Sequence, residues 1–169
     1  ESEPSAVFTV QPSFIRRISA RPAFTMGGSG GGIAQLARLF VMQELQQGKK
    51  PALCPNMDQL GSITAADVGR AAQVGDPLAV SILQAAGEQL GKGLSMVIDL
   101  LNPERIVIGS IFARCREQLW PAAARMIAAE TLPAARAACT VVPCALSESV
   151  GDIAALTVAL YYQEKENRL

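Results

Sequence analysis

Two glycine-containing segments carry residue types that could bind a phosphorylated ligand. The first contains Gly28, Ser29, Gly30 and Gly31, and a helical pattern of apolar residues follows it from Ile33. Backbone N–H groups converge in such a loop, and the amino end of the next helix is partially positive, so the segment could cradle a phosphate. Its spacing is not that of a P-loop or of a dinucleotide fingerprint. The alternative interpretation is a loop that passes close to a sheet or to a subunit partner.

The second segment is the exit from a short apolar strand, where Gly109, Ser110 and Ile111 follow Ile106–Ile108. Ligands of α/β proteins bind outside the carboxyl ends of the strands, where backbone is exposed. We therefore predict that these three residues border a ligand cleft.

The rest of the composition excludes several kinds of chemistry. The chain has no histidine, so it contains no Ser-His or Cys-His catalytic unit. Cys54, Cys115, Cys139 and Cys144 form no close pair, which disfavours structural zinc and favours buried, reduced thiols in a cytoplasmic protein.

Charge and hydropathy argue against two classes of partner. Fifteen basic and 15 acidic residues cancel, whereas nucleic-acid binding needs a basic surface, so we expect this segment to contact no nucleic acid. Every long apolar stretch is interrupted by polar residues before it could span a bilayer, and the acidic start is unlike a signal peptide. We therefore expect no membrane association.

Hydrophobic periodicity and capping residues outline the elements that must position these segments. Thr64 and Asp67 form a capping-box pair, Gly75 ends the helix that they start, and Asp76 with Pro77 starts the next. We expect helices at 33–47, 64–74, 77–101, 112–129 (with a break or kink at Pro121) and 153–163 (capped by Asp152), and strands at 6–10, 106–108 and 140–145. This order predicts an α/β fold with layered helices in one domain or lobe, 1–169, in which 1–23 are poorly assigned.

The helix at 77–101 carries a stripe of small residues, Gly87, Gly91 and Ser95, one every four positions. Glycine costs about 1 kcal/mol relative to alanine inside a helix. Two glycines in one stripe therefore indicate that another backbone packs closely there, within the chain or across a subunit interface. The stripe also predicts self-association, and we expect a homodimer.

From Thr64 to Tyr162 the sequence resembles the carboxyl-terminal lobe of ROK proteins, the family of repressors, open reading frames and sugar kinases. The segments ITAADVGRAAQVGDPLA, LGKGLSMVIDLLNPERIVIGS and VVPCALSESVGDIAALTVAL carry the likeness, and GSGGGIAQLAR does so more loosely. The resemblance implies an actin-like (ribonuclease H-like) ATPase fold, with helices packed on a mixed sheet. It also implies ATP, Mg²⁺ and a hexose-type sugar as ligands, with adenosine beside Gly109, Ser110 and Ile111. The loop from Gly28 to Gly31 is assigned to the same cleft.

Some of the family's parts are absent from this sequence. The phosphate loop and catalytic aspartate of the amino-terminal lobe are missing, as is a histidine-and-cysteine zinc loop, and Ser110 stands where a second glycine is usual. We therefore assign no catalytic residue to this chain. It is predicted to be a fragment of a two-lobe sugar kinase, inactive alone.

Two other functions stay open. The chain could be the effector-sensing lobe of a ROK-type repressor, or a degenerate interaction module that binds no ligand. The stretch from Arg21 to Ala34 also resembles the glycine-rich loop of the ATP-grasp domain in carbamoyl-phosphate synthetase large chains. That second resemblance finds no support after Ala34, because no acidic metal-binding residues recur downstream.

Overall fold

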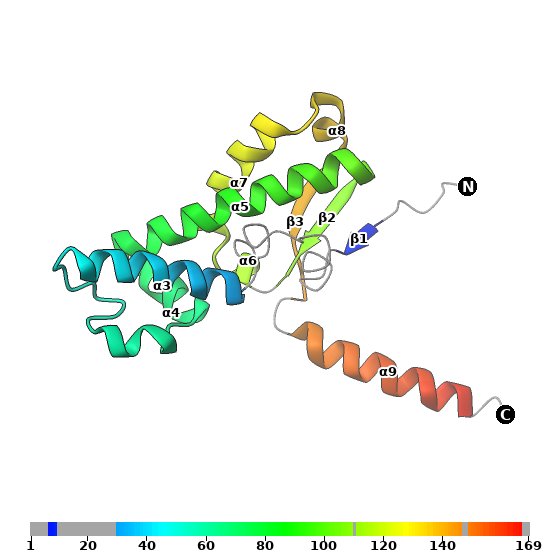
Figure 1. The fold of residues 1–169 in the computed structure, drawn as a ribbon. Coiled ribbons are helices and arrows are strands. Elements are labelled where there is room, and N and C mark those ends of the chain that lie inside the picture. The colour runs from blue at the N-terminus through cyan, green and yellow to red at the C-terminus, as the bar shows by residue number, and fades with distance from the viewer. Residues whose placement is uncertain (1–6, 10–29, 110, 147–148, 167–169) are drawn as a thin grey trace.

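The structure, a computed structural model, describes residues 7–9, 30–109, 111–146 and 149–166. In chain order the elements are β1 (Val7–Thr9), α3 (Gly30–Gln46), the 3-10 helix η1 (Met57–Ser62), α4 (Ala65–Gln73), α5 (Pro77–Leu101), β2 (Arg105–Ile108), α6 (Ile111–Arg114), α7 (Arg116–Glu130), α8 (Pro133–Ala138), β3 (Thr140–Pro143) and α9 (Val150–Glu166). The predicted α/β class is confirmed, since the described elements are mostly helices, packed beside a small sheet (Figure 1).

The described strands form a three-stranded sheet in the order β1-β2-β3. Both pairings are parallel, with Phe8 and Val141 flanking Ile106 of the central strand. The strands that the structure describes are the parallel part of the mixed sheet that the resemblance implies, and each is joined to the next by a helical crossover that brings the chain back in the same direction. Ile106 is fully buried, as expected for the middle strand of such a sheet.

The long helix α5 is the centre of the packing. It contacts α7 on one side, and it contacts α3 and α4 on another (Figure 1). Its side chains Ile82, Leu83 and Ile98 are buried, together with Ile33 of α3 and Phe112 of α6. This cluster is the core that holds the helical layers together.

The capping residues start and end α4 and α5 as predicted. Gly75 has a φ of 84°, a left-handed conformation that favours glycine. The Asp76 carboxylate accepts a hydrogen bond of 2.8 Å from the N–H of Ala79, and Pro77 is the first helical residue. Asn102 closes α5 in the left-handed region, with a φ of 42°.

The small-residue stripe of α5 packs against the backbone of α7. A Cβ atom at Gly87 would lie 2.3 Å from the carbonyl oxygen of Leu119, and one at Gly91 would lie 2.5 Å from that of Ala123. The prediction of close backbone packing is confirmed, and the contact is within the chain. The stripe therefore does not supply the face of a homodimer.

A hydrogen bond ties the end of α5 to the turn before α8. Asp99 is exposed, and its Oδ1 accepts a hydrogen bond of 3.0 Å from the N–H of Leu132. Leu132 is the residue immediately before α8 and has no capping bond from its own side chain. The carboxylate also favours the partially positive amino end of that helix.

Several boundaries differ from those predicted. The first is the start of α3, which begins at Gly30 and not at Ile33. Gly30 packs beside Ala65 of α4, a contact distant in sequence that local periodicity does not reveal. The second is the start of α9, which begins at Val150, so that Asp152 lies in its first turn and does not precede it.

At Pro121 we predicted a break or a kink, and the break is wrong, because α7 continues through this residue; the kink stays a prediction. Proline lacks an N–H, but at this place only the bond to the carbonyl of Glu117 is lost. The chain breaks instead at Cys115, whose φ of −117° and ψ of 30° are not helical. The buried Cys115 packs against Gly69 of α4, and no local sequence pattern predicts this contact.

We expect Gly87→Ala and Gly91→Ala each to lower the free energy of unfolding by about 1–3 kcal/mol, because the new methyl group would overlap a carbonyl of α7. Urea unfolding measures the loss. Gly61→Ala is the matched control, since nothing lies within 4 Å of its Cβ position. Equal stability of all three variants would contradict this packing.

Candidate functional site

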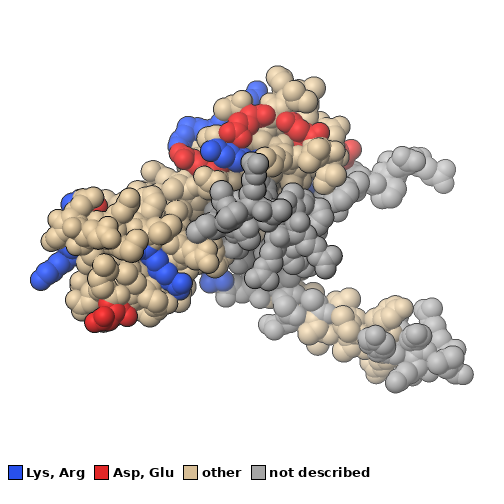
Figure 2. Space-filling view, in the orientation of Figure 1, with Lys and Arg blue, Asp and Glu red and all other residues tan. Residues whose placement is uncertain are grey.

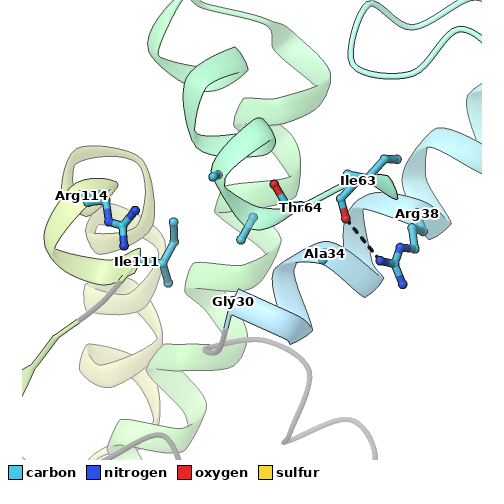
Figure 3. A pocket seen from close by; sticks show the side chains of 9 residues that line it. Gly30, Ala34, Arg38, Ile63, Thr64, Ile111 and Arg114 are labelled. Carbon is cyan, nitrogen blue, oxygen red and sulfur yellow. Dashed lines mark hydrogen bonds between the residues drawn. The ribbon is translucent and has the colours of Figure 1, made fainter. Parts of the chain in front are cut away.

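A pocket of about 370 Å³ lies where α3 and α4 begin, beside α6 (Figure 3). Its lining is made of small and apolar residues with two arginines: Gly30, Ala34, Arg38, Ile63, Thr64, Ala65, Ala66, Ile111 and Arg114. Gly30 and Ile111 come from the two segments that the sequence marked separately. The structure therefore brings parts of both predicted ligand segments to one pocket.

Local structure explains why these side chains converge. Gly30, Ala34 and Arg38 are spaced four residues apart and so share one face of α3. Ile111 and Arg114 lie one turn apart on α6, which follows closely after β2. The pocket thus lies near the carboxyl end of the central strand, where α/β folds place their ligands.

The electrostatic character of the pocket is positive. Among the described residues that line it, two are arginines and none is acidic. The amino ends of α3 and α4 add partial positive charge. Arg38 and Arg114 lie at opposite ends of the labelled residues in Figure 3. An anionic ligand with a compact apolar part fits this arrangement.

Arg38 also holds the rim of the pocket. Its Nη2 donates hydrogen bonds to the carbonyl oxygens of Gly61, at 2.9 Å, and Ile63, at 3.3 Å. Its Nε is buried and has no hydrogen-bond partner within the described part of the chain. The guanidinium therefore fixes the segment that leads into α4 and keeps one donor unused.

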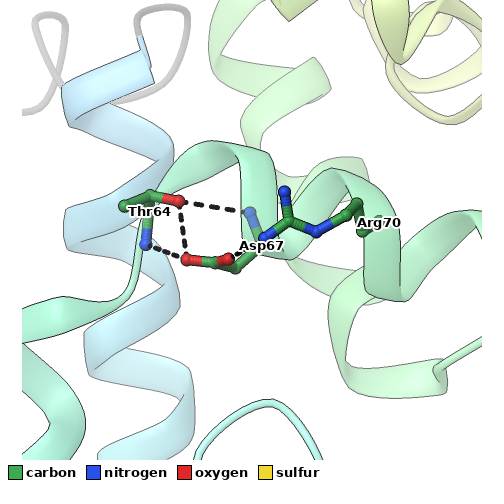
Figure 4. Close-up of polar contacts among 3 residues, drawn as sticks. All are labelled: Thr64, Asp67 and Arg70. Atoms are coloured by element: carbon green, nitrogen blue, oxygen red, sulfur yellow. Dashed lines mark hydrogen bonds and ion pairs between the residues drawn. The ribbon is translucent and has the colours of Figure 1, made fainter.

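Thr64 starts α4 at the edge of the pocket through a capping box (Figure 4). The Asp67 N–H donates to Thr64 Oγ1 at 3.2 Å, and the Thr64 N–H donates to Asp67 Oδ2 at 2.9 Å. The Thr64 hydroxyl donates to the same Oδ2 at 2.6 Å, and Arg70 forms an ion pair with the other carboxylate oxygen. These contacts fix the first turn of α4, from which Ala65 and Ala66 reach the pocket.

The same contacts act on the carboxyl group of Asp67. Hydrogen bonds from the hydroxyl and the N–H of Thr64 lower the pKa of Asp67, and the charge of Arg70 lowers it further. The ionised Asp67 carboxylate therefore stabilises the folded chain fully above the ordinary pKa of 3.8. This stabilisation is lost as the pH falls through the lowered pKa of Asp67.

The remaining predicted site residues lie outside the pocket lining or outside the described residues. Gly109 follows β2, and its Cβ position is 3.6 Å from the Cβ of Cys144, so it lies beside the end of β3. Gly31 is exposed and is not among the lining residues. Gly28, Ser29 and Ser110 lie outside the part of the chain that the structure describes.

Sequence reasoning missed the two arginines and the start of α4 as lining residues. Arg38 could have been found from its spacing of eight residues after Gly30 on one helix face, and Arg114 from its position one turn after Ile111. Thr64 was recognised as a helix cap only. Nothing in the sequence near it indicates that the first turn of α4 faces α6.

The cysteines and acidic residues do not form a metal site in the described ranges, where no group of three potential ligands occurs. All four cysteines are free thiols; Cys54 and Cys115 are buried as predicted, whereas Cys139 and Cys144 are only half-buried. Burial raises the pKa of the Cys115 and Cys139 thiols, which keeps them protonated. Mg²⁺ prefers carboxylate oxygens, and the described pocket lining offers none, so these residues do not fit that ion.

No helix within the described ranges is both long and apolar enough to cross a membrane.

Comparison with known proteins settles the family. Residues 29–161, most of the chain, match the model of the ROK family. This chain belongs to the ROK family. The resemblance inferred from the sequence is thereby confirmed, and the ROK relatives fall into two functional groups.

One group contains repressors. The DNA-binding transcriptional repressor Mlc of Escherichia coli (strain K12) is 29% identical over 107 residues, which are 63% of this chain and 26% of Mlc. A crystal structure of a ROK family transcriptional regulator, a homologue of the E. coli Mlc protein, has a TM-score of 0.58 and 28% identity over 71% of this chain and 28% of that one.

The other group contains sugar kinases. The glucokinase of Halalkalibacterium halodurans is 33% identical over 91 residues, 54% of this chain and 26% of the enzyme. A crystal structure of a ROK family glucokinase from Streptomyces griseus, in complex with glucose and AMPPNP, has a TM-score of 0.58 over 76% of this chain and 41% of that one. Its identity of 18% shows a shared fold alone. This chain spans about a quarter of the length of both Mlc and the H. halodurans glucokinase.

We expect Thr64→Val to raise the pKa of Asp67 towards its ordinary value and to lower the free energy of unfolding at neutral pH by about 0.5–2 kcal/mol, because the cap loses its hydroxyl. An NMR titration gives the pKa, and urea unfolding at pH 7 gives the stability. Thr157→Val, which removes a hydroxyl bonded to the carbonyl of Ile153 in α9, is the control and leaves Asp67 unchanged. An unaltered Asp67 pKa in Thr64→Val would disprove the role given to this hydroxyl.

Proposed function

We propose that this chain is the carboxyl-terminal, nucleotide-binding lobe of an ATP-dependent sugar kinase of the ROK family. The complete protein would have a second, amino-terminal lobe and would phosphorylate a hexose-type sugar. The observation that carries the proposal is the pocket, in which Gly30 and Ile111 meet near the carboxyl end of β2. The relationship to glucokinases supports the kinase chemistry.

The lining residues suit the parts of a nucleotide. An adenine ring needs flat apolar walls, and Ala34, Ile63 and Ile111 offer them. The phosphates need positive charge, which Arg114 and the amino ends of α3 and α4 provide. A volume of about 370 Å³ lies within the range of about 300–1,000 Å³ that is usual for small-molecule sites.

Phosphoryl transfer depends mostly on positioning and on electrostatic stabilisation. In this proposal the chain contributes positioning: the pocket binds the adenosine, and the first turn of α4, fixed by Thr64 and Asp67, keeps one wall in place. Mg²⁺ in such reactions neutralises phosphate charge, and its protein ligands would come from outside the pocket lining. The base that deprotonates the sugar would be an aspartate of the other lobe, so this chain alone would be inactive.

A second candidate function is the effector-sensing lobe of a ROK repressor. The identity to Mlc and to the solved Mlc homologue favours it. In that case the pocket would bind a small-molecule effector, and a DNA-binding segment outside this sequence would contact the operator. A degenerate module that binds no ligand is the third possibility, and the open, positively charged pocket argues against it.

We also propose that the protein acts in the cytoplasm as a homodimer. The free thiols support a reducing compartment. Because α7 covers the glycine stripe of α5, the dimer face would be formed by other surfaces. The balanced charge of the chain supports the absence of nucleic-acid contacts from this segment.

The full-length protein tests the function directly. We expect it to bind AMPPNP in calorimetry and to convert ATP and at least one hexose of a panel into ADP and a hexose phosphate, detected by mass spectrometry. A protein that binds operator DNA and turns over no ATP would instead support the repressor. Failure of AMPPNP, sugars and DNA all to bind would support the ligand-free module.

We expect Arg114→Gln in the full-length protein to weaken AMPPNP binding by about tenfold, or about 1.4 kcal/mol, while adenosine binding stays within twofold. The reason is that the guanidinium would contact phosphate and not the base. Arg116→Gln is the matched control, since Arg116 is also exposed but lies outside the pocket. Equal AMPPNP affinity of the two variants would remove Arg114 from the site.

A further inference from the structure

The side chains that line the pocket offer hydrogen-bond donors to a ligand. Arg38 and Arg114 carry guanidinium groups, which donate hydrogen bonds and accept none. The hydroxyl of Thr64 is engaged twice with Asp67, because it donates to Oδ2 and accepts from the N–H. Among the described lining residues, no side chain is a carboxylate, an amide or an imidazole. A ligand that fits must therefore present acceptor atoms to these side chains.

The acidic groups of the chain do not change this inventory. Most of the acidic side chains visible in Figure 2 gather over α7 and α8, in the part of the view opposite to α4. Asp67, which follows the lining residues Ala65 and Ala66 in α4, is held by Thr64 and by Arg70. Neither place supplies the pocket with a free acceptor for an amino group.

Arg38 also occupies two backbone acceptors at its end of the pocket. Its Nη2 donates to the carbonyl oxygens of Gly61, at 2.9 Å, and of Ile63, at 3.3 Å. An amino group of a ligand would have to compete with the guanidinium for these two oxygens. A ligand acceptor, in contrast, would find further donors on the same group. One of them, Nε, is buried without a partner in the described part of the chain, and a buried unpaired donor is costly.

In the proposed nucleotide pose, Arg38 lies at the end that holds the base. Ala34 and Arg38 are one turn apart on the same face of α3, whereas Arg114, which we assign to the phosphates, lies at the other end of the labelled residues (Figure 3). A purine ring against Ala34 and Ile63 would therefore turn one edge to the guanidinium. The O6 and N7 atoms of a 6-oxopurine form a pair of acceptors that arginine binds with two N–H groups. The 6-amino group of adenine presents hydrogen atoms on the same edge.

We propose that Arg38 makes the pocket selective for 6-oxopurine nucleotides, such as ITP and GTP, over ATP. This inference rests on the proposed nucleotide site and names the base that the site prefers. The O6 and N7 atoms of the base accept hydrogen bonds from the Arg38 guanidinium, while Arg114 binds the phosphates of either nucleotide. ATP then binds as the weaker phosphoryl donor, because its 6-amino group faces donors.

Nucleotide affinities of the full-length protein test the proposal. AMPPNP and its inosine counterpart, inosine 5′-(β,γ-imido)triphosphate, differ only in the base, and calorimetry gives both dissociation constants. We expect the inosine analogue to bind about tenfold more tightly, which equals about 1.4 kcal/mol. Equal affinities, or tighter binding of AMPPNP, would overturn the selectivity and leave the nucleotide site in place. If neither analogue binds, the nucleotide site itself is wrong and the selectivity is overturned with it.

Substitutions at position 38 separate recognition of the base from support of the rim. Arg38→Gln introduces an amide that accepts as well as donates, so we expect the preference for the inosine analogue to fall by about tenfold. Arg38→Lys keeps a cation that only donates and should keep the preference. Because both affinities are measured on the same variant, a general loosening of the rim cancels in their ratio.

Arg114→Gln is the matched control for this ratio. It should weaken both analogues alike, because their phosphates are identical, and leave the preference unchanged. An unaltered preference in Arg38→Gln, or its loss in Arg38→Lys, would overturn the role given to Arg38.

Discussion

The close contact between α5 and the backbone of α7 is the constraint on which the rest of the structure depends. Gly87 and Gly91 leave no room for a side chain, because the carbonyl oxygens of Leu119 and Ala123 occupy that space. The position of α7 in turn fixes α6, which is joined to it through the single residue Cys115. Ile111 and Arg114 therefore reach the pocket only because two glycines of a distant helix let α7 approach.

The pocket depends on this packing for its shape and on its lining residues for its charge. One wall comes from α3, a second from the capped start of α4 and a third from α6. Since helix amino ends line the pocket and an arginine lies at each end of it, we expect the interior to favour an anion. The ROK family unites kinases and repressors among the relatives of this chain, and both of our functional proposals assign a small ligand to this pocket.

Much of the fold could be predicted because its signals are local. The capping box of Thr64, the Asp76–Pro77 start and the end of α5 at Asn102 each depend on neighbouring residues. The start of α3 among glycines and the break at Cys115 depend instead on packing against α4, which no short pattern encodes. Of the predicted site residues, Gly30 and Ile111 line the pocket. The spacing of Arg38 and Arg114 on their own helices was readable in the sequence, but no local pattern indicates that α3, α4 and α6 surround one space.

The hydrogen bond between Asp99 and the N–H of Leu132 bears on modularity. The unit from β2 to β3 looks self-contained along the chain, yet the helix that leads into its last strand takes its amino-terminal acceptor from α5. If this unit were transferred to another protein without α5, the start of α8 would lose the carboxylate that accepts the hydrogen bond from Leu132. A transplanted piece therefore needs α5 together with its cap Asp76 and cannot start at Arg105.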